Sequence, residues 1–183
     1  MRGFSLIEVL VAVFVLAVGV LGAGATQLAA LRTRHESHLM SAAVQLAASL
    51  AERMQANAGV MHLPDGDNPY LTLHYDAAEG APSPPASLCL AGAACNGAQL
   101  AALDLFEFKQ ALHRHFPGGR VRVCRDAQPW NGASHALGWS CAPGAAPVVI
   151  KLGWRGKNPD GSAAQDGAQQ FAPSVALTLA EVK

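Results

Sequence analysis

The chain has 183 residues, of which 51% are apolar and 14% charged, and its 13 basic and 13 acidic residues give a formal net charge of zero. This composition excludes a disordered chain, which needs low hydrophobicity and high net charge. It also argues against a protein that holds nucleic acid through a basic excess, so we expect no nucleic-acid partner.

The first predicted element is a long apolar run near the N-terminus. Residues 9–31 contain no charge, and these 23 residues span about 35 Å as a helix, enough to cross the hydrocarbon core of a bilayer. Glu8 stands directly before the run. A carboxylate in lipid costs about 2.5–3.5 kcal/mol at mid-membrane and less near the edge. An acid at this place therefore predicts a partner of positive charge.

The helical pattern continues beyond the apolar run. Apolar residues recur at a three-to-four spacing as far as Met54, and Asn57-Ala58-Gly59 is a stop signal. The sequence therefore predicts one helix of about 55 residues, apolar all round in its first half and amphipathic in its second.

Three interpretations of the N-terminus compete. A secretory signal peptide would be cut at Ala23-Gly24-Ala25, would divide the predicted helix, and would release a periplasmic binding module. A plain signal anchor would keep the whole run. A prepilin leader would be cut before the run, and it is the interpretation in which Glu8 has a role.

The segment Gly3-Phe4-Ser5-Leu6-Ile7-Glu8 resembles the class III signal of type IV pilins and pseudopilins. The resemblance implies that a prepilin peptidase cuts after Gly3 and that Phe4, the new N-terminal residue, is N-methylated. It further implies that Glu8 meets the N-terminal amine of a neighbouring subunit. The electrostatics agree, because two opposite buried charges lower each other's cost only if they meet.

The remaining elements are read from shorter patterns. Residues 60–100 are punctuated by Pro and Gly and are expected to form loops, with one short strand candidate at 71–75. Asp104 and Glu107 match a capping box, which predicts a helix over 104–116. Three strand candidates follow, at 120–125, 148–154 and 174–182.

An antiparallel sheet packed on a helix follows from these elements. The expected fold class is α+β, the type IV pilin fold, in which a long N-terminal helix packs under a small antiparallel sheet. The expected divisions are a leader at 1–3, a membrane-spanning and assembly half of the helix at 4–31, an amphipathic half at 32–58 and a globular α+β domain at 59–183.

Two further segments resemble PilV-type minor pilins: the helix end at 50–57, and residues 102–119 with their Asp-Leu, aromatic and Pro-Gly-Gly pattern. The resemblance implies a subunit that primes type IV pilus assembly, joins other minor pilins, the major pilin and a tip adhesin, and supports adhesion and twitching motility. It also implies a bacterial inner-membrane protein with its C-terminal domain in the periplasm, later placed near the pilus tip. A type II secretion minor pseudopilin shares the leader and helix and is the nearest alternative.

The four cysteines are Cys89, Cys95, Cys124 and Cys141. In the oxidising periplasm disulfides are the default. Three pairings are possible, and we expect the sequence-local one, Cys89 with Cys95 and Cys124 with Cys141. The sequence has no Cys-x-x-Cys, nucleophile or phosphate-loop motif, so we expect no metal, no cofactor and no enzymatic activity.

Two weaker binding candidates lie in the C-terminal half. Trp130, Trp139 and Trp154 could line a ligand surface, but sparse aromatics in a small domain are expected in its core. Arg120 and Arg122 share a predicted strand face, yet the neutral total charge argues against a nucleic-acid patch.

Overall fold

The computed structural model describes residues 5–89, 94–142, 144–156, 162 and 171–180. The chain divides into two compact units, Met1–His38 and Leu39–Lys183, which we call the N-terminal and C-terminal units and consider separately.

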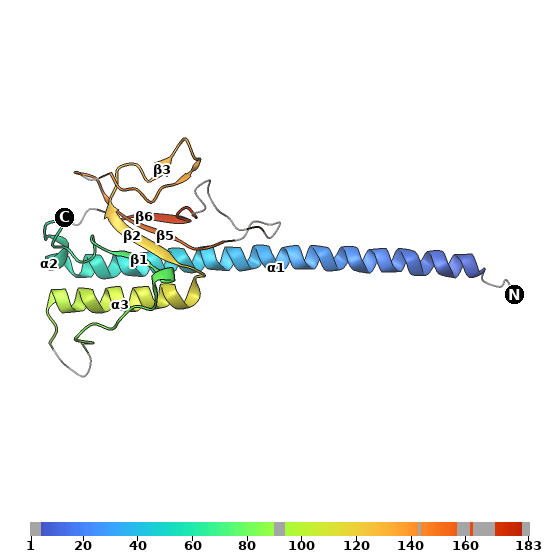
Figure 1. The fold of residues 1–183 in the computed structure, drawn as a ribbon, viewed down its shortest axis with the longest axis horizontal. Coiled ribbons are helices and arrows are strands. Elements are labelled where there is room, and N and C mark those ends of the chain that lie inside the picture. The colour runs from blue at the N-terminus through green and yellow to red at the C-terminus, as the bar shows by residue number, and fades with distance from the viewer. Residues whose placement is uncertain (1–4, 90–93, 143, 157–161, 163–170, 181–183) are drawn as a thin grey trace. The chain divides into compact units, whose positions relative to one another are not determined.

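The predicted long helix is confirmed as α1, Leu6–Ala56 (Figure 1). Its most apolar 18-residue window has a mean hydropathy of 2.7, and none of that window is buried. No proline interrupts the helix, and Val, Leu and Ala dominate its first half. By length and composition it could cross a membrane, although a signal sequence would meet the same criteria.

Within the C-terminal unit, α1 buries one stripe of small and medium side chains. The spacing of three to four residues places them on a single face. The helix ends at Ala56, where the stop signal predicted it, and a short helix α2 follows at Ala58–Met61. The buried residues of α1 are Leu39, Ala43, Ala47, Leu50, Ala51 and Met54.

Helix α3 covers Gly97–His115 and therefore begins earlier than predicted. Its capping box consists of Asn96 and Gln99: Asn96 Oδ1 accepts from Gln99 N at 2.9 Å, and Gln99 Oε1 accepts from Asn96 N at 3.0 Å. The predicted capping box of Asp104 and Glu107 is wrong, because both acids lie inside the helix. Two polar residues three apart share a helix face anywhere along a helix, so their spacing alone does not mark its start.

Four strands form one antiparallel sheet in the order β1-β2-β5-β6. The strand predictions at 120–125, 148–154 and 174–182 correspond to β2, β5 and β6, but β6 ends at Thr178, earlier than predicted, and residues 181–182 lie outside the described residues. The strands are β1 His74–Asp76, β2 Arg120–Arg125, β5 Val148–Gly153 and β6 Val175–Thr178.

The strand predicted at 71–75 is wrong in its bounds. The amides of Leu71 and Thr72 both donate to Asn68 O, so these residues form a turn, and pairing with β2 as a strand begins at His74. A short alternating pattern cannot distinguish a strand from a turn whose backbone is already hydrogen-bonded to itself.

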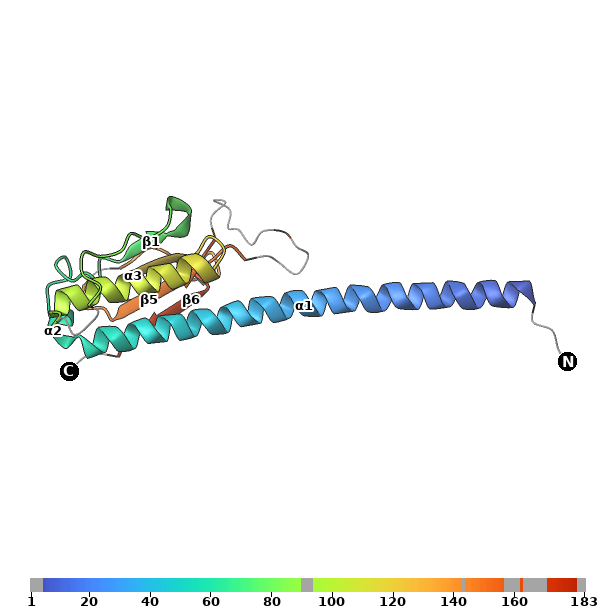
Figure 2. The ribbon, with the colours of Figure 1, turned by 90° about the horizontal axis from the view of Figure 1, so that it is seen from below.

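The core lies between one face of the sheet and the two long helices. Figures 1 and 2 show α3 running beside the C-terminal part of α1 on this side of the sheet. Val121 and Ile150 from the sheet join Met54 and Phe108 from the helices in one buried cluster. Sheet residues alternate between two faces, so the residues between these strand positions point away from the helices.

A second, two-stranded sheet was not predicted. It pairs β3, Trp130–Asn131, with β4, Ala136–Leu137. Trp130 is 52% exposed, so its expected place in the core is wrong, whereas Trp154 is buried as expected. Strands of two residues are too short to show a periodic pattern.

Candidate functional site

Only one of the three N-terminal candidate residues lies in the part of the chain that the structure describes. Gly3 and Phe4 lie outside the described residues. Glu8 lies in the first turn of α1, where its amide donates to Ser5 O at 3.0 Å. Its exposed side chain borders a shallow hollow on the helix surface, formed with Val9, Ala12, Val13 and Leu16.

The Glu8 carboxylate has no basic partner within the part of the chain that the structure describes. Its surroundings on α1 are apolar side chains. A charge in such surroundings is tolerated only when it reaches water or an opposite charge. The arrangement suits a contact with a positive group of another molecule.

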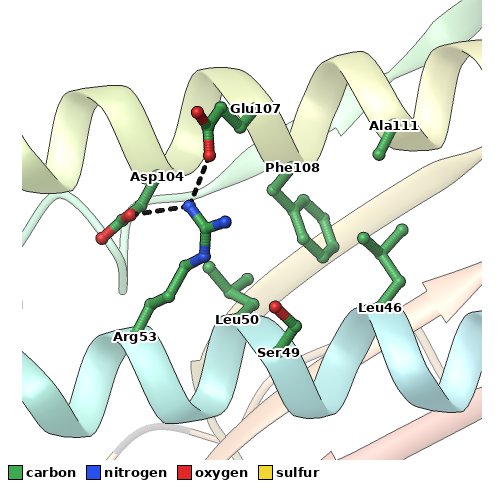
Figure 3. A pocket seen from close by; sticks show the side chains of 8 residues that line it. All are labelled: Leu46, Ser49, Leu50, Arg53, Asp104, Glu107, Phe108 and Ala111. Carbon is green, nitrogen blue, oxygen red and sulfur yellow. Dashed lines mark hydrogen bonds and ion pairs between the residues drawn. The ribbon is translucent and has the colours of Figure 1, made fainter. Parts of the chain in front are cut away.

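A second cluster joins the end of α1 to α3 inside the C-terminal unit. Arg53 Nη1 donates to Asp104 Oδ1 at 2.9 Å and to Glu107 Oε2 at 2.6 Å (Figure 3). The hydrogen bond to Glu107 raises the pKa of Arg53, burial opposes this effect, and the bond to Asp104 adds to it. Leu46, Leu50 and Phe108 are among the side chains of the groove beside this ion pair.

Asp104 continues this cluster into the core. Its side chain is only 7% exposed, and its Oδ2 accepts from the Tyr70 hydroxyl at 2.7 Å. Burial first, and then the bond to Asp104, raise the pKa of Tyr70, so the phenol remains protonated and donates. Asn57 Nδ2 donates in turn to Tyr70 Oη at 3.2 Å and to Gly97 O at 2.7 Å.

This network joins the chain at the end of α1 to α3. Arg53 lies in the last turn of α1 and Asn57 directly follows that helix, whereas Asp104 lies in α3. Gly97 permits the close approach, because a Cβ there would lie 2.8 Å from Asn57 Oδ1. Sequence reasoning missed the network, although an acid pair three residues apart in a helix was the available signal.

Both disulfides have the sequence-local connectivity. Cys89 is bonded to Cys95, and Cys124 to Cys141. The first bond joins two cysteines six positions apart, and Cys95 lies just before α3. The second links β2 to the chain that follows the β3–β4 hairpin.

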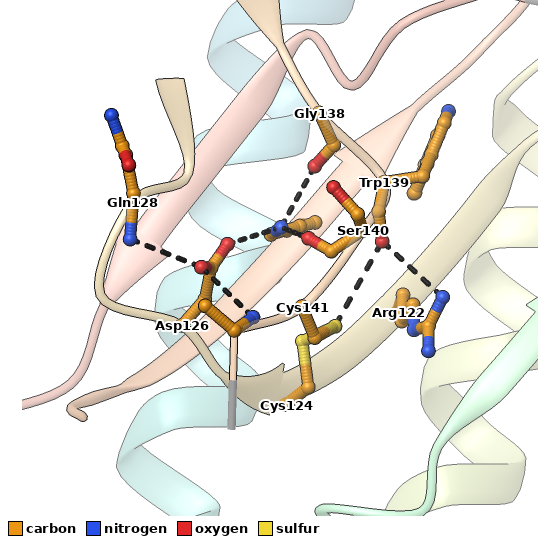
Figure 4. A network of polar contacts seen from close by, with 10 residues as sticks. Arg122, Cys124, Asp126, Gln128, Gly138, Trp139, Ser140 and Cys141 are labelled. Atoms are coloured by element: carbon orange, nitrogen blue, oxygen red, sulfur yellow. Dashed lines mark hydrogen bonds and ion pairs between the residues drawn. A yellow bond between two sulfur atoms is a disulfide. The ribbon is translucent and has the colours of Figure 1, made fainter. Parts of the chain in front are cut away.

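The least expected group is Lys151, which is fully buried in β5. Its Nζ lies 2.5 Å from Asp126 Oδ2 and donates to Gly138 O at 2.7 Å and to Ser140 O. Figure 4 shows Asp126, Gly138 and Ser140 converging on this point. The available signal was a single charge inside the apolar strand Val-Val-Ile-Lys-Leu-Gly.

Asp126 is held as a carboxylate. Its Oδ1 accepts from Gln128 N at 3.0 Å and from Ala142 N at 3.2 Å. Burial on its own would raise the pKa of Asp126, but the hydrogen bonds from Lys151 and these two amides together lower it. The pair is therefore a structural ion pair.

One comparison with known proteins identifies the N-terminal segment. The family model for the prokaryotic N-terminal methylation motif matches residues 1–24, which include Gly3, Phe4 and Glu8. No curated protein and no solved structure matches the chain. The long helix with a small antiparallel sheet is consistent with the pilin fold. The chain thus carries the N-terminal methylation motif that is typical of type IV pilin-like prepilins, a motif that implies processing by a prepilin peptidase and assembly with other pilins.

Proposed function

We propose that the chain is a minor pilin, a low-copy structural subunit of the type IV pilus and not an enzyme. The observation that carries the proposal is the methylation motif at residues 1–24, with Glu8 in the first turn of an apolar helix. The resemblance of 50–57 and 102–119 to PilV-type minor pilins supports the narrower assignment. In this role the subunit helps prime assembly, joins the tip complex with other minor pilins, and supports adhesion and twitching motility.

The proposed life cycle assigns a task to each part of the chain. Residues 1–3 are a leader removed by the prepilin peptidase, and 4–31 hold the subunit in the inner membrane. Residues 32–58 continue the helix, and 59–183 form the periplasmic domain. The two disulfides agree with an oxidising compartment.

The mature chain is expected to begin with N-methylated Phe4. Mass spectrometry of the N-terminal peptide from purified membranes measures this directly. Replacing Gly3 by a bulky residue should leave the leader attached, while Gly19→Ala, whose added methyl meets no atom within 4 Å, should be processed normally. A mature chain that starts at Thr26 would instead reveal a secretory signal peptide and would refute the proposal.

Glu8→Ala is expected to leave the subunit in the membrane but to reduce its amount in sheared pili at least tenfold. The proposed reason is that the carboxylate neutralises the Phe4 amine of an adjoining subunit, and loss of one partner leaves a buried charge unpaired. A tenfold loss corresponds to only about 1.4 kcal/mol, well within the effect of such a loss. Quantitative immunoblots of pilus and membrane fractions provide the measurement.

Glu52→Ala is the matched control, because Glu52 is an exposed acid of the same helix. It should enter pili at the wild-type level. Normal incorporation of Glu8→Ala would contradict the proposed role of Glu8.

The type II secretion pseudopilin remains a second candidate because the methylation motif is shared by both assemblies. Deleting the gene separates them. Loss of surface pili with intact protein secretion supports the pilus, and loss of secretion with intact pili supports the secretion system.

A further inference from the structure

A buried lysine lies on the sheet face that is turned away from the helices. Ile150 and Leu152 of β5 belong to the core cluster. Side chains alternate along a strand, so Lys151 between them points to the opposite face. Its side chain is fully buried there. Lysine is rarely buried unless it is paired, so the chain that covers this face decides whether the amine meets water.

The covering chain is residues 126–142, which we call the cover segment. It supplies the acceptors that the structure shows around Lys151 Nζ, namely Asp126 Oδ2, Gly138 O and Ser140 O. Apart from Asp126 it contains no Asp, Glu, Lys or Arg. Residues 130–135 at the tip of the cover segment are exposed. The segment is therefore held at its base, by which we mean the residues near its two ends, at Asp126 and at 138–142.

Several contacts hold that base close to Cys141. Arg122 Nη1 donates to Trp139 O at 3.3 Å, Trp139 Nε1 donates to Phe171 O at 2.7 Å, and Figure 4 shows the first of these two contacts. The guanidinium carbon of Arg120 lies 4.7 Å from the centre of the Trp139 ring. The Cys124–Cys141 bond adds a covalent tie between this region and β2.

The non-covalent contacts alone contribute little net free energy in favour of the closed cover segment over the open one. Taking an ammonium and a carboxylate out of water largely offsets their attraction, so a buried pair contributes little net stability. Hydrogen-bonding groups at the base regain water when the segment opens. The disulfide acts differently, because it reduces the conformational entropy that the segment gains on opening. Closure therefore depends on the covalent tie.

We propose that the Cys124–Cys141 disulfide is a redox latch on Lys151: while the bond is formed the cover segment buries the amine, and reduction of the bond exposes it. The reductant is a dithiol, which supplies two electrons and two protons. The S–S bond breaks, Cys124 and Cys141 become thiols, and the dithiol becomes a disulfide. This inference concerns the C-terminal unit alone and does not depend on the proposed role in pilus assembly.

The test measures the acylation rate of individual lysines in the full chain in detergent micelles. An amine-reactive acyl reagent is applied before and after treatment with a dithiol, and labelling is quantified by peptide mass spectrometry. Lys151 is expected to be protected in the oxidised protein and to react at least about tenfold faster after reduction, as in local opening of a protein segment. Lys109, a half-exposed residue of α3, should react at the same rate in both states.

Two cysteine variants separate the disulfides. Cys89→Ser/Cys95→Ser should keep Lys151 protected until the dithiol is added, whereas Cys124→Ser/Cys141→Ser should expose it without reductant. The latch would be overturned if Lys151 stayed protected after reduction. It would also be overturned if Lys151 were labelled as fast before reduction as after it. A parallel rise at Lys109 with loss of the helical circular dichroism would overturn it as well, because general unfolding would then explain the exposure. If a cysteine variant does not fold, the acylation rate of Lys151 in the wild-type protein before and after reduction still tests the latch.

Discussion

Lys151→Ala is expected to lower the free energy of unfolding of the C-terminal unit by about 3–5 kcal/mol, the usual effect of removing one partner of a buried ion pair. The substitution leaves the Asp126 carboxylate, 1% exposed, without the cation 2.5 Å away. It also removes the donor to Gly138 O and Ser140 O. Chemical denaturation of the full chain in detergent, followed by near-ultraviolet circular dichroism, measures the change.

Lys109→Ala is the control, since a half-exposed lysine on α3 should change stability by no more than about 0.5 kcal/mol. The double variant Lys151→Met/Asp126→Asn removes both charges and keeps an acceptor for the amides of Gln128 and Ala142. We expect it to be more stable than Lys151→Ala, because no buried charge is then left unpaired. Equal losses in Lys151→Ala and Lys109→Ala would contradict the structural role of the pair.

The same pair predicts a dependence on pH with a defined sign. The folded-state pKa of Asp126 lies below its ordinary value of 3.8. The contribution of the carboxylate to stability is therefore fully present above that value and is lost as the pH falls through the folded-state pKa. The stability difference between wild type and Lys151→Ala should consequently shrink below about pH 4.

Asp104→Ala is expected to destabilise the C-terminal unit by about 2–4 kcal/mol, because it removes a buried acceptor shared by two donors. The Tyr70 hydroxyl loses the carboxylate at 2.7 Å, and Arg53 loses the less exposed of its two acids. Asp104→Asn should recover part of the loss, since an amide oxygen still accepts from Tyr70. Equilibrium unfolding monitored by tyrosine and tryptophan fluorescence provides the measurement.

Glu107→Ala is the matched control for Asp104→Ala. It removes the other acid that pairs with Arg53, but Glu107 is 48% exposed. An exposed ion pair contributes about 0–1 kcal/mol, so the control should be nearly neutral. If the two alanine variants were equally destabilised, burial would not be the reason for the importance of Asp104.

Much of the fold could be predicted because its signals are local. The stop at Asn57, the turn after Phe116 and the alternation in β2 each depend on residues within a few positions of one another. The errors arose where a local pattern had two structural meanings. Asp104 and Glu107 have the spacing of a capping box, but that spacing also places two acids on one helix face toward Arg53.

The candidate site residues also divide into those that a local sequence pattern predicts and those that it does not. Gly3, Phe4 and Glu8 could be proposed as site residues because they lie in one contiguous segment, which the methylation-motif model matches. Trp130 was misplaced because burial depends on how a loop lies on the sheet, and hydrophobicity alone does not report that arrangement.

By itself, the amino-acid order determined the apolar helix, the methylation motif at its start and the class of the fold, since each follows from neighbours along the chain. Only the tertiary structure decided that Arg53 meets an acid 51 positions away and that Lys151 is buried under the cover segment. Both contacts depend on sheet register and helix packing. These bring distant residues to within hydrogen-bond range, and no periodicity in the sequence encodes that proximity.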